Sequence, residues 1–117
     1  MANGVTEQDI SIIWVPGSLE IPFAVSQMAL TGNWAAFVVL GAVIRGDTYH
    51  FELVALETAK GVNEVSRTMN IPIGFGVLAT QNEKQADDRS GGCLGNRGSD
   101  AAMAALEMAN LVRLFGE

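Results

Sequence analysis

The single histidine of this chain, His50, occupies a position suited to proton transfer. It follows a Gly-Asp-Thr-Tyr stretch that leaves one of the most apolar runs, and it begins a segment with helical spacing of apolar residues. A turn that enters a helix presents free backbone N–H groups and the positive end of the helix dipole, which suit a phosphate. An imidazole there can accept and donate a proton near neutral pH. The alternative is that Asp47 or Thr48 caps the helix and His50 is an exposed residue of its first turn.

A second group of reactive residues lies in the glycine-rich segment 83–99. Its basic residues, Lys84, Arg89 and Arg97, cluster in a chain that has 7 Lys and Arg against 13 Asp and Glu and a net charge of −6. The planar guanidinium of Arg89 matches a phosphate bidentately, and glycines allow the backbone to approach a ligand. The segment therefore indicates a site for a small anion, although a solvated loop explains its composition equally well.

Other kinds of site find no support in the sequence. One cysteine, Cys93, excludes an internal disulfide, and one histidine with scattered carboxylates does not give the spacing of a metal site. No Gly-x-Ser-x-Gly, Walker or dinucleotide-binding pattern is present. We therefore expect acid–base chemistry on a phosphorylated small molecule, with no metal and no cofactor.

Length and composition predict a single domain over residues 1–117, with 49% hydrophobic residues to form its core. No apolar run reaches the roughly 18 residues that span a bilayer, and no basic region precedes an apolar leader. The acidic balance disfavours nucleic acid and anionic membranes as partners. The expected location is the cytoplasm, or the plastid (without a transit peptide in this chain) if the source is a plant.

The elements that must position these residues alternate along the chain. Apolar, β-branched runs predict three buried strands, at Ile10–Val15, Phe37–Ile44 and Pro72–Thr80. Helical spacing and end signals predict helices at about 18–32, 50–69 and 83–89, and a last helix that begins at Asp100. Apolar strands separated by helices predict an α/β fold with a parallel sheet covered on both faces.

Ligands of such sheets gather beyond the carboxyl ends of the strands. Three segments follow the predicted strand ends, at 16–20, 45–50 and 80–89. We therefore expect the His50 turn and Arg89 to bind a phosphate from two sides of one crevice at this edge.

Six motifs of the chain fit one known family. "WVPGSLEIPFA", "GAVIRGDTYHFE", "PIGFGVLAT", "QADDRSGG", "GNRG" and "AALEMANL" occur in this order and spacing. Together they resemble lumazine synthase, the penultimate enzyme of riboflavin biosynthesis, from about Ile10 to the C-terminus. The resemblance implies a flavodoxin-like, three-layer αβα fold. The archaeal type of riboflavin synthase, a relative with the same fold, is disfavoured by "GNRG" and "QADDR".

The resemblance also implies a reaction, catalysed by a transferase without a cofactor. The family condenses 5-amino-6-ribitylamino-uracil with 3,4-dihydroxy-2-butanone 4-phosphate to 6,7-dimethyl-8-ribityllumazine, with release of phosphate and water. Schiff-base formation, loss of phosphate and ring closure need proton transfer and anion binding rather than a redox group. This requirement agrees with the chemistry expected from the residues.

Individual roles are implied by the positions that match the family. His50 corresponds to the proton-transfer residue, and Arg89 to the phosphate-binding arginine, assisted by the turn of Gly46, Asp47 and Thr48. Phe75 corresponds to the aromatic residue that stacks on the pyrimidine. The other implied substrate contacts are Ser18, Leu19, Glu20, Val43, Ile44 and Arg97. Arg97 stands where the family usually has lysine, and Leu19 where it often has an aromatic residue.

The resemblance finally bears on assembly. Family sites lie between neighbouring subunits of a homo-oligomer, with Phe75 and Arg89 from the adjacent chain, and the pentamers stay as such, form decamers or build an icosahedral shell. The family's N-terminal strand and helix are missing here, and that strand would lie inside the sheet, between Ile10–Val15 and Phe37–Ile44. We expect a second chain or a partner copy to supply it, or the chain to be an engineered fragment. The alternative function is an assembly scaffold with impaired catalysis.

Overall fold

A computed structural model describes residues 4–45, 50–93 and 95–116. Its centre is a pair of parallel strands, β1 (Phe37–Ile44) and β2 (Ile73–Thr80), which pair residue by residue over their whole length. Both strands form where the apolar runs predict them. The molecule is elongated, with extents of 50 × 29 × 23 Å.

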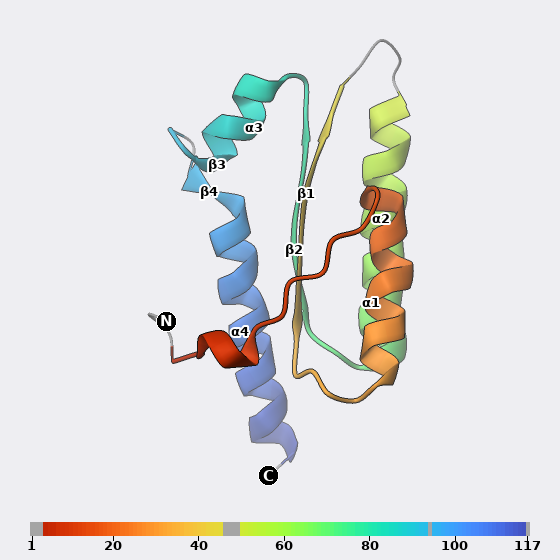
Figure 1. The fold of residues 1–117 in the computed structure, drawn as a ribbon, viewed down its shortest axis with the longest axis vertical. Coiled ribbons are helices and arrows are strands. Elements are labelled where there is room, and N and C mark those ends of the chain that lie inside the picture. Colours follow the sequence, from red (N-terminus) through yellow and green to blue (C-terminus); the bar gives the residue numbers. More distant parts are fainter. Residues whose placement is uncertain (1–3, 46–49, 94, 117) are drawn as a thin grey trace.

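Helices cover both faces of this sheet (Figure 1). The helices α1 (Ile21–Leu30) and α2 (His50–Met69) lie on one face, and α4 (Arg97–Gly116) lies on the other. The predicted α/β arrangement with a parallel sheet between helical layers is therefore confirmed. None of the helices within the described ranges is both long enough and apolar enough to cross a membrane.

Shorter elements connect these layers. The 3-10 helix η1 (Glu7–Asp9) lies near the N-terminus, and η2 (Ser18–Glu20) leads directly into α1. After β2, the short helix α3 (Glu83–Arg89) leads into an antiparallel hairpin of β3 (Ser90–Gly92) and β4 (Gly95–Asn96), and α4 follows at once.

The expected first strand, Ile10–Val15, is not a strand in this structure. The segment belongs to neither sheet and runs as an irregular connection from η1 to η2 (Figure 1). Its side chains are largely exposed, Trp14 to 90%. The prediction of three strands in the parallel sheet was therefore wrong, because an apolar run becomes a strand only beside a backbone with which it can pair. Among the described residues β1 pairs with β2 alone, so the strand expected between Ile10–Val15 and β1 stays a prediction.

Alternation along the strands divides the core between the two faces. On one face Val39 of β1 packs in a cluster with Ile21 and Val25 of α1 and Val62 of α2. On the other face Gly74 and Gly76 of β2 lie directly against α4. Full burial of a valine stabilises a fold by about 1.5–3 kcal/mol, so the first cluster provides much of the folding energy of this layer.

Two helix starts differ from the prediction. Residues 18–20 form the 3-10 helix η2 rather than the first turn of α1, and the α-helix begins just before Pro22, whose ring is tolerated in a first turn. The last helix begins at Arg97 rather than at Asp100. Asn96 caps it, since its side-chain oxygen accepts the Ser99 N–H at 2.9 Å.

Candidate functional site

The carboxyl ends of the two strands bring the start of α2 and the whole of α3 to one end of the molecule. Ile44 lies opposite Thr80, and the Arg45 N–H donates to the Thr80 carbonyl at 2.9 Å. His50 is the first residue of α2 and is exposed at this end. The turn of Gly46, Asp47 and Thr48 lies outside the described residues, so its role in binding phosphate stays a prediction.

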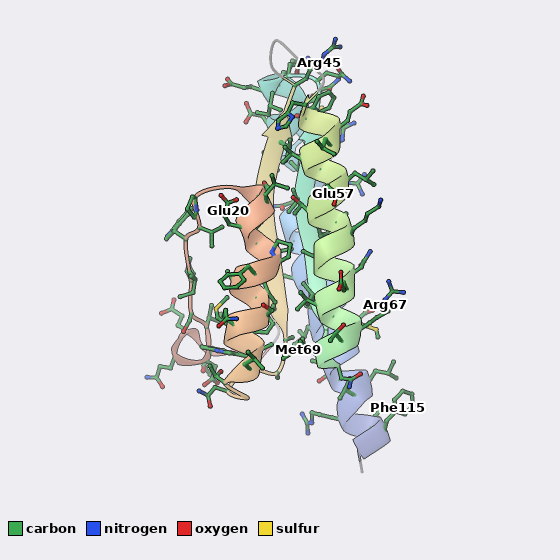
Figure 2. The ribbon with its side chains drawn as sticks, turned by 90° about the vertical axis from the view of Figure 1, so that its right-hand side faces the viewer. Glu20, Arg45, Glu57, Arg67, Met69 and Phe115 are labelled. Carbon is green, nitrogen blue, oxygen red and sulfur yellow. The ribbon has the colours of Figure 1, made fainter. Side chains whose placement is uncertain are left out.

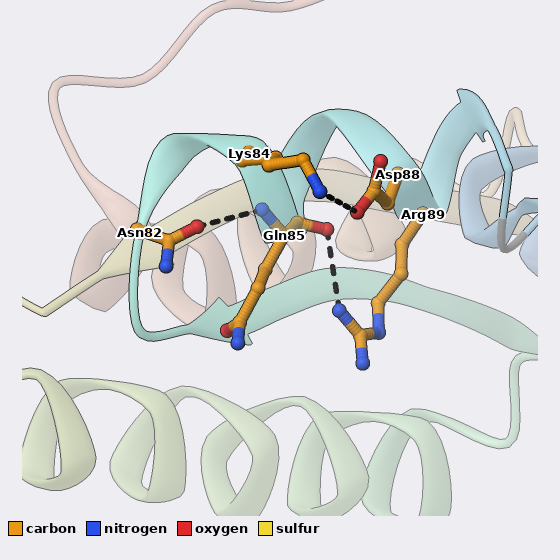
Figure 3. Close-up of polar contacts among 5 residues, drawn as sticks. All are labelled: Asn82, Lys84, Gln85, Asp88 and Arg89. Atoms are coloured by element: carbon orange, nitrogen blue, oxygen red, sulfur yellow. Dashed lines mark hydrogen bonds and ion pairs between the residues drawn. The ribbon is translucent and has the colours of Figure 1, made fainter.

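The helix that carries Arg89 is held at its start by two side chains, and Figure 3 shows the contact of the first of them, Asn82. The Asn82 side-chain oxygen accepts the Gln85 N–H at 2.9 Å, and the Gln85 side-chain oxygen accepts the Gln81 N–H at 2.8 Å. Asn and Gln three residues apart form a capping box. Here the Gln85 side chain accepts the N–H of Gln81, whereas in the usual motif it would accept the N–H of the capping residue, Asn82. At the other end of α3, the Arg89 Nη1 donates to the Gln85 carbonyl at 3.3 Å. The capping therefore fixes the helix from which the guanidinium extends.

The hairpin β3–β4 brings the two expected anion-binding arginines together. Ser90 pairs with Asn96. Arg89 directly precedes Ser90 and Arg97 directly follows Asn96, so the two arginines lie just outside this pair. Paired Cα atoms are about 5 Å apart and each further residue adds at most about 3.8 Å, so the two arginine Cα atoms lie within roughly 13 Å. Two arginines that flank one short hairpin, at the end of α3 and the start of α4, give a place where an anion is favoured.

His50 and Arg89 lie at the same end of the sheet but on opposite sides of it. Helix α2 packs on the face of α1, whereas α3 and the hairpin lie on the side of α4 (Figure 1). The expected crevice also includes the turn of residues 46–48, which lies outside the described residues, so the binding of phosphate from two sides stays a prediction.

The segment Ser18–Glu20 does not lie at that edge, contrary to expectation. The Ser18 hydroxyl is 3.5 Å from the position of a Cβ on Gly41, in the middle of β1. Glu20 lies well below Arg45 along the long axis (Figure 2). Because the preceding residues 10–15 are not part of the sheet, no strand carries this turn to the carboxyl edge. Leu19 and Glu20 are exposed, and Ser18 is half-buried.

The remaining expected substrate contacts are distributed along the strands. Phe75 is the third residue of β2, opposite Val39, and its side chain is 40% exposed. It lies five positions before Thr80, about 17 Å along an extended strand. Val43 is buried near the end of β1, and Ile44 is partly exposed at the end itself. This chain alone thus keeps Phe75 away from the carboxyl edge where His50 begins α2.

The cysteine next to the hairpin has a perturbed thiol. A side-chain hydrogen bond with Asp88 raises the pKa of Cys93, and desolvation and the negative charge of that carboxylate add to the effect. Cys93 is free and exposed. Within the described ranges, no group of three or more His, Cys, Asp and Glu side chains is arranged to hold a metal ion.

We predict that Asp88→Asn speeds alkylation of Cys93 by iodoacetamide at pH 8. Removing the carboxylate lowers the thiol pKa and so raises the thiolate fraction, which is the reactive form. The rate should rise severalfold at pH 8, and the two proteins should converge at a pH above both pKa values. Equal rates at pH 8 would contradict the assigned contact.

A family model described as 6,7-dimethyl-8-ribityllumazine synthase matches residues 1–113. Two similar proteins carry the same name. The one from Chlorobium phaeovibrioides is 48% identical over 111 residues, and the one from Clostridium kluyveri is 50% identical over 111 residues. Each match covers 95% of this chain and 72% of the relative.

These matches confirm the family indicated by the six motifs, and they agree with an α/β fold that places basic residues and a histidine at the carboxyl edge of a parallel sheet. The chain belongs to the 6,7-dimethyl-8-ribityllumazine synthase family, a family of transferases in riboflavin biosynthesis.

Proposed function

We propose that this chain catalyses the condensation of 5-amino-6-ribitylamino-uracil with 3,4-dihydroxy-2-butanone 4-phosphate to 6,7-dimethyl-8-ribityllumazine. Family membership supports the reaction. The observation of this structure that carries the proposal is the hairpin that joins Arg89 to Arg97 at the end of the sheet where His50 begins α2. The arrangement offers an anion site and a proton-transfer group, the two functions that the reaction requires.

In the proposed mechanism the guanidinium of Arg89 binds the phosphate of the butanone substrate. A bidentate pair holds the group in one orientation and stabilises it as it leaves with its negative charge. Arg97 adds a second positive charge from the other side of the hairpin. His50 moves a proton during Schiff-base formation and ring closure. Phe75 supplies an aromatic face for the pyrimidine ring.

The site is proposed to be completed between copies of the chain. His50 and Arg89 lie on opposite sides of the sheet. Phe75 lies near the start of β2, away from the carboxyl edge where those two residues lie. The family resemblance implies that a neighbouring copy presents its Phe75 and Arg89 to this copy's His50, and such a copy would bring together a histidine and an arginine that one chain holds on opposite sides of its sheet. Large apolar side chains are available for such contacts, since Trp14 is 90%, Phe115 79% and Phe23 70% exposed. A pentamer, or a shell built from pentamers, is the proposed assembly, in a soluble protein of the cytoplasm.

The phosphate assignment predicts the behaviour of Arg89 variants. Arg89→Ala should lower kcat/KM by about 10- to 100-fold, mainly through the KM of the phosphorylated substrate, because hydrogen bonds to charged groups contribute about 1.5–3 kcal/mol. Arg89→Lys should recover part of the loss, since an ammonium keeps the charge but not the fork. The rate is followed by the absorbance of the lumazine product.

The matched control is Lys84→Ala, which removes one positive charge from the same helix. Lys84 is 86% exposed, and its weak pair with Asp88, 3.9 Å apart, adds little stability. Its kcat/KM should stay within about twofold of the parent protein. Equal losses in both variants would show that general charge, and not Arg89, matters.

The second candidate function is an assembly scaffold with impaired catalysis. The exposed apolar residues favour assembly under either function. A folded, oligomeric protein without turnover would support the scaffold.

A further inference from the structure

A continuous chain of hydrogen bonds connects the end of β1 to the proposed phosphate-binding arginine. The Arg45 Nη1 donates to the Gln81 side-chain oxygen at 3.2 Å, and the Gln81 N–H donates to the Gln85 side-chain oxygen at 2.8 Å. The Gln85 carbonyl then accepts from the Arg89 Nη1 at 3.3 Å (Figure 3). Gln85 is the member of this chain that contacts both the strand end and the arginine.

The position of Gln85 explains how it connects these two parts. As the third residue of α3 it receives the Asn82 cap through its N–H, and its side chain turns back to the residue that follows β2. Its backbone carbonyl accepts a hydrogen bond from the guanidinium of Arg89, which lies one turn further along α3. The hydrogen bond between its side chain and the Gln81 N–H is exposed, whereas the contact of its carbonyl with Arg89 is part-buried. The residue thus ties the orientation of α3, and with it Arg89, to the rigid edge of the sheet.

We propose that Gln85 is a positioning residue that orients Arg89 for binding the phosphate of the substrate, and this inference rests on the proposed role of Arg89. Loss of the Gln85 amide leaves the Gln81 N–H without its acceptor and removes one of the contacts that hold the start of α3 at the end of β2, where the Thr80 hydroxyl still donates to the Asn82 carbonyl at 3.1 Å. The helix itself persists, because Asn82 still caps the backbone N–H of residue 85. The guanidinium then samples more orientations, and a bidentate contact depends strongly on orientation.

The proposal is tested by a double-mutant cycle on the purified oligomer, with inorganic phosphate as the probe. Kd values are measured by calorimetry for the parent protein, Gln85→Ala, Arg89→Ala and the double variant. Gln85→Ala should weaken phosphate binding by about fivefold, the effect of one hydrogen bond. In the Arg89→Ala background the same change should have no further effect, because coupled residues are not additive.

Steady-state kinetics give a second readout that a merely structural role would not move. Gln85→Ala should raise the KM of the phosphorylated substrate by about fivefold and leave the KM of the ribitylamino-uracil within about twofold. Gln27→Ala, the same truncation at an exposed position of α1, should change neither value. A rise in both KM values would indicate general disruption and overturn the positioning role.

The outcomes distinguish the two proposals. If Arg89→Ala weakens phosphate binding and Gln85→Ala does not, the positioning role is overturned and the function of Arg89 stands. If Gln85→Ala weakens binding equally with and without Arg89, its effect does not act through the arginine and the inference is likewise overturned. If Arg89→Ala leaves the Kd unchanged, the phosphate assignment fails and the inference fails with it.

Discussion

Replacing Gly74 with alanine is expected to lower the free energy of unfolding by roughly 3 kcal/mol, because overpacking against backbone cannot be relieved by a rotamer change. A Cβ on Gly74 would overlap the carbonyl oxygen of Ala101 and lie 2.7 Å from the carbonyl carbon and 3.2 Å from the Ala105 Cβ. Helix α4 would have to move away from β2, and the contacts along that whole layer would loosen. The melting temperature should fall by roughly 10 °C, measured by circular dichroism at one fixed protein concentration.

A strand glycine on the opposite face provides the matched control. A Cβ on Gly41 of β1 would meet the Ser18 hydroxyl at 3.5 Å and a Val77 methyl group at 4.0 Å, which are ordinary contact distances. Gly41→Ala should therefore change the free energy of unfolding by no more than about 1 kcal/mol. Equal melting temperatures for the two variants would contradict the close packing of α4 on β2.

The second large effect is expected on catalysis. His50→Ala should lower kcat by about 100-fold, since a general acid–base group contributes at least this factor. The imidazole lies at the exposed start of α2, so its removal creates no cavity, and the melting temperature should be unchanged. The measurement is the initial rate of lumazine formation with both substrates saturating.

Glu57 provides the comparison for this variant. It is exposed on the same helix (Figure 2) and follows His50 by seven positions, about two turns. Glu57→Ala should leave kcat within about twofold of the parent value. A kcat within threefold of the parent for His50→Ala would show that the proton is moved by another group.

Much of the fold follows from local sequence signals. The apolar runs predict β1 and β2, and helical spacing predicts α2 from His50 to Met69 and α3 from Glu83 to Arg89 with the observed ends. These predictions are correct because the apolar face of each element packs against a partner within the same chain. Ile10–Val15 has an equally apolar sequence, yet it forms no strand, since pairing depends on a neighbouring backbone that the run itself does not encode.

In the candidate site, too, local sequence signals predict some features, and others depend on contacts between distant segments. Asn82 and Gln85, three residues apart, carry the capping signal of α3 in the sequence, but the charged residues of segment 83–99 do not point to it. The approach of Arg97 to Arg89 depends on a hairpin with two strands of three residues or fewer, in a segment whose glycines permit many turns. The separation of His50 from Phe75 follows from strand register and sheet sides, which spacing along the chain does not determine.

The most direct test of the proposed function is whether the purified chain makes the lumazine product. Both substrates are incubated with the protein, its oligomeric state is checked by light scattering, and the product is followed by its absorbance. We expect product to form in proportion to protein concentration and to be strongly reduced by Arg89→Ala and by His50→Ala. A folded oligomer that forms no product, or turnover that survives both substitutions, would contradict the function proposed for this site.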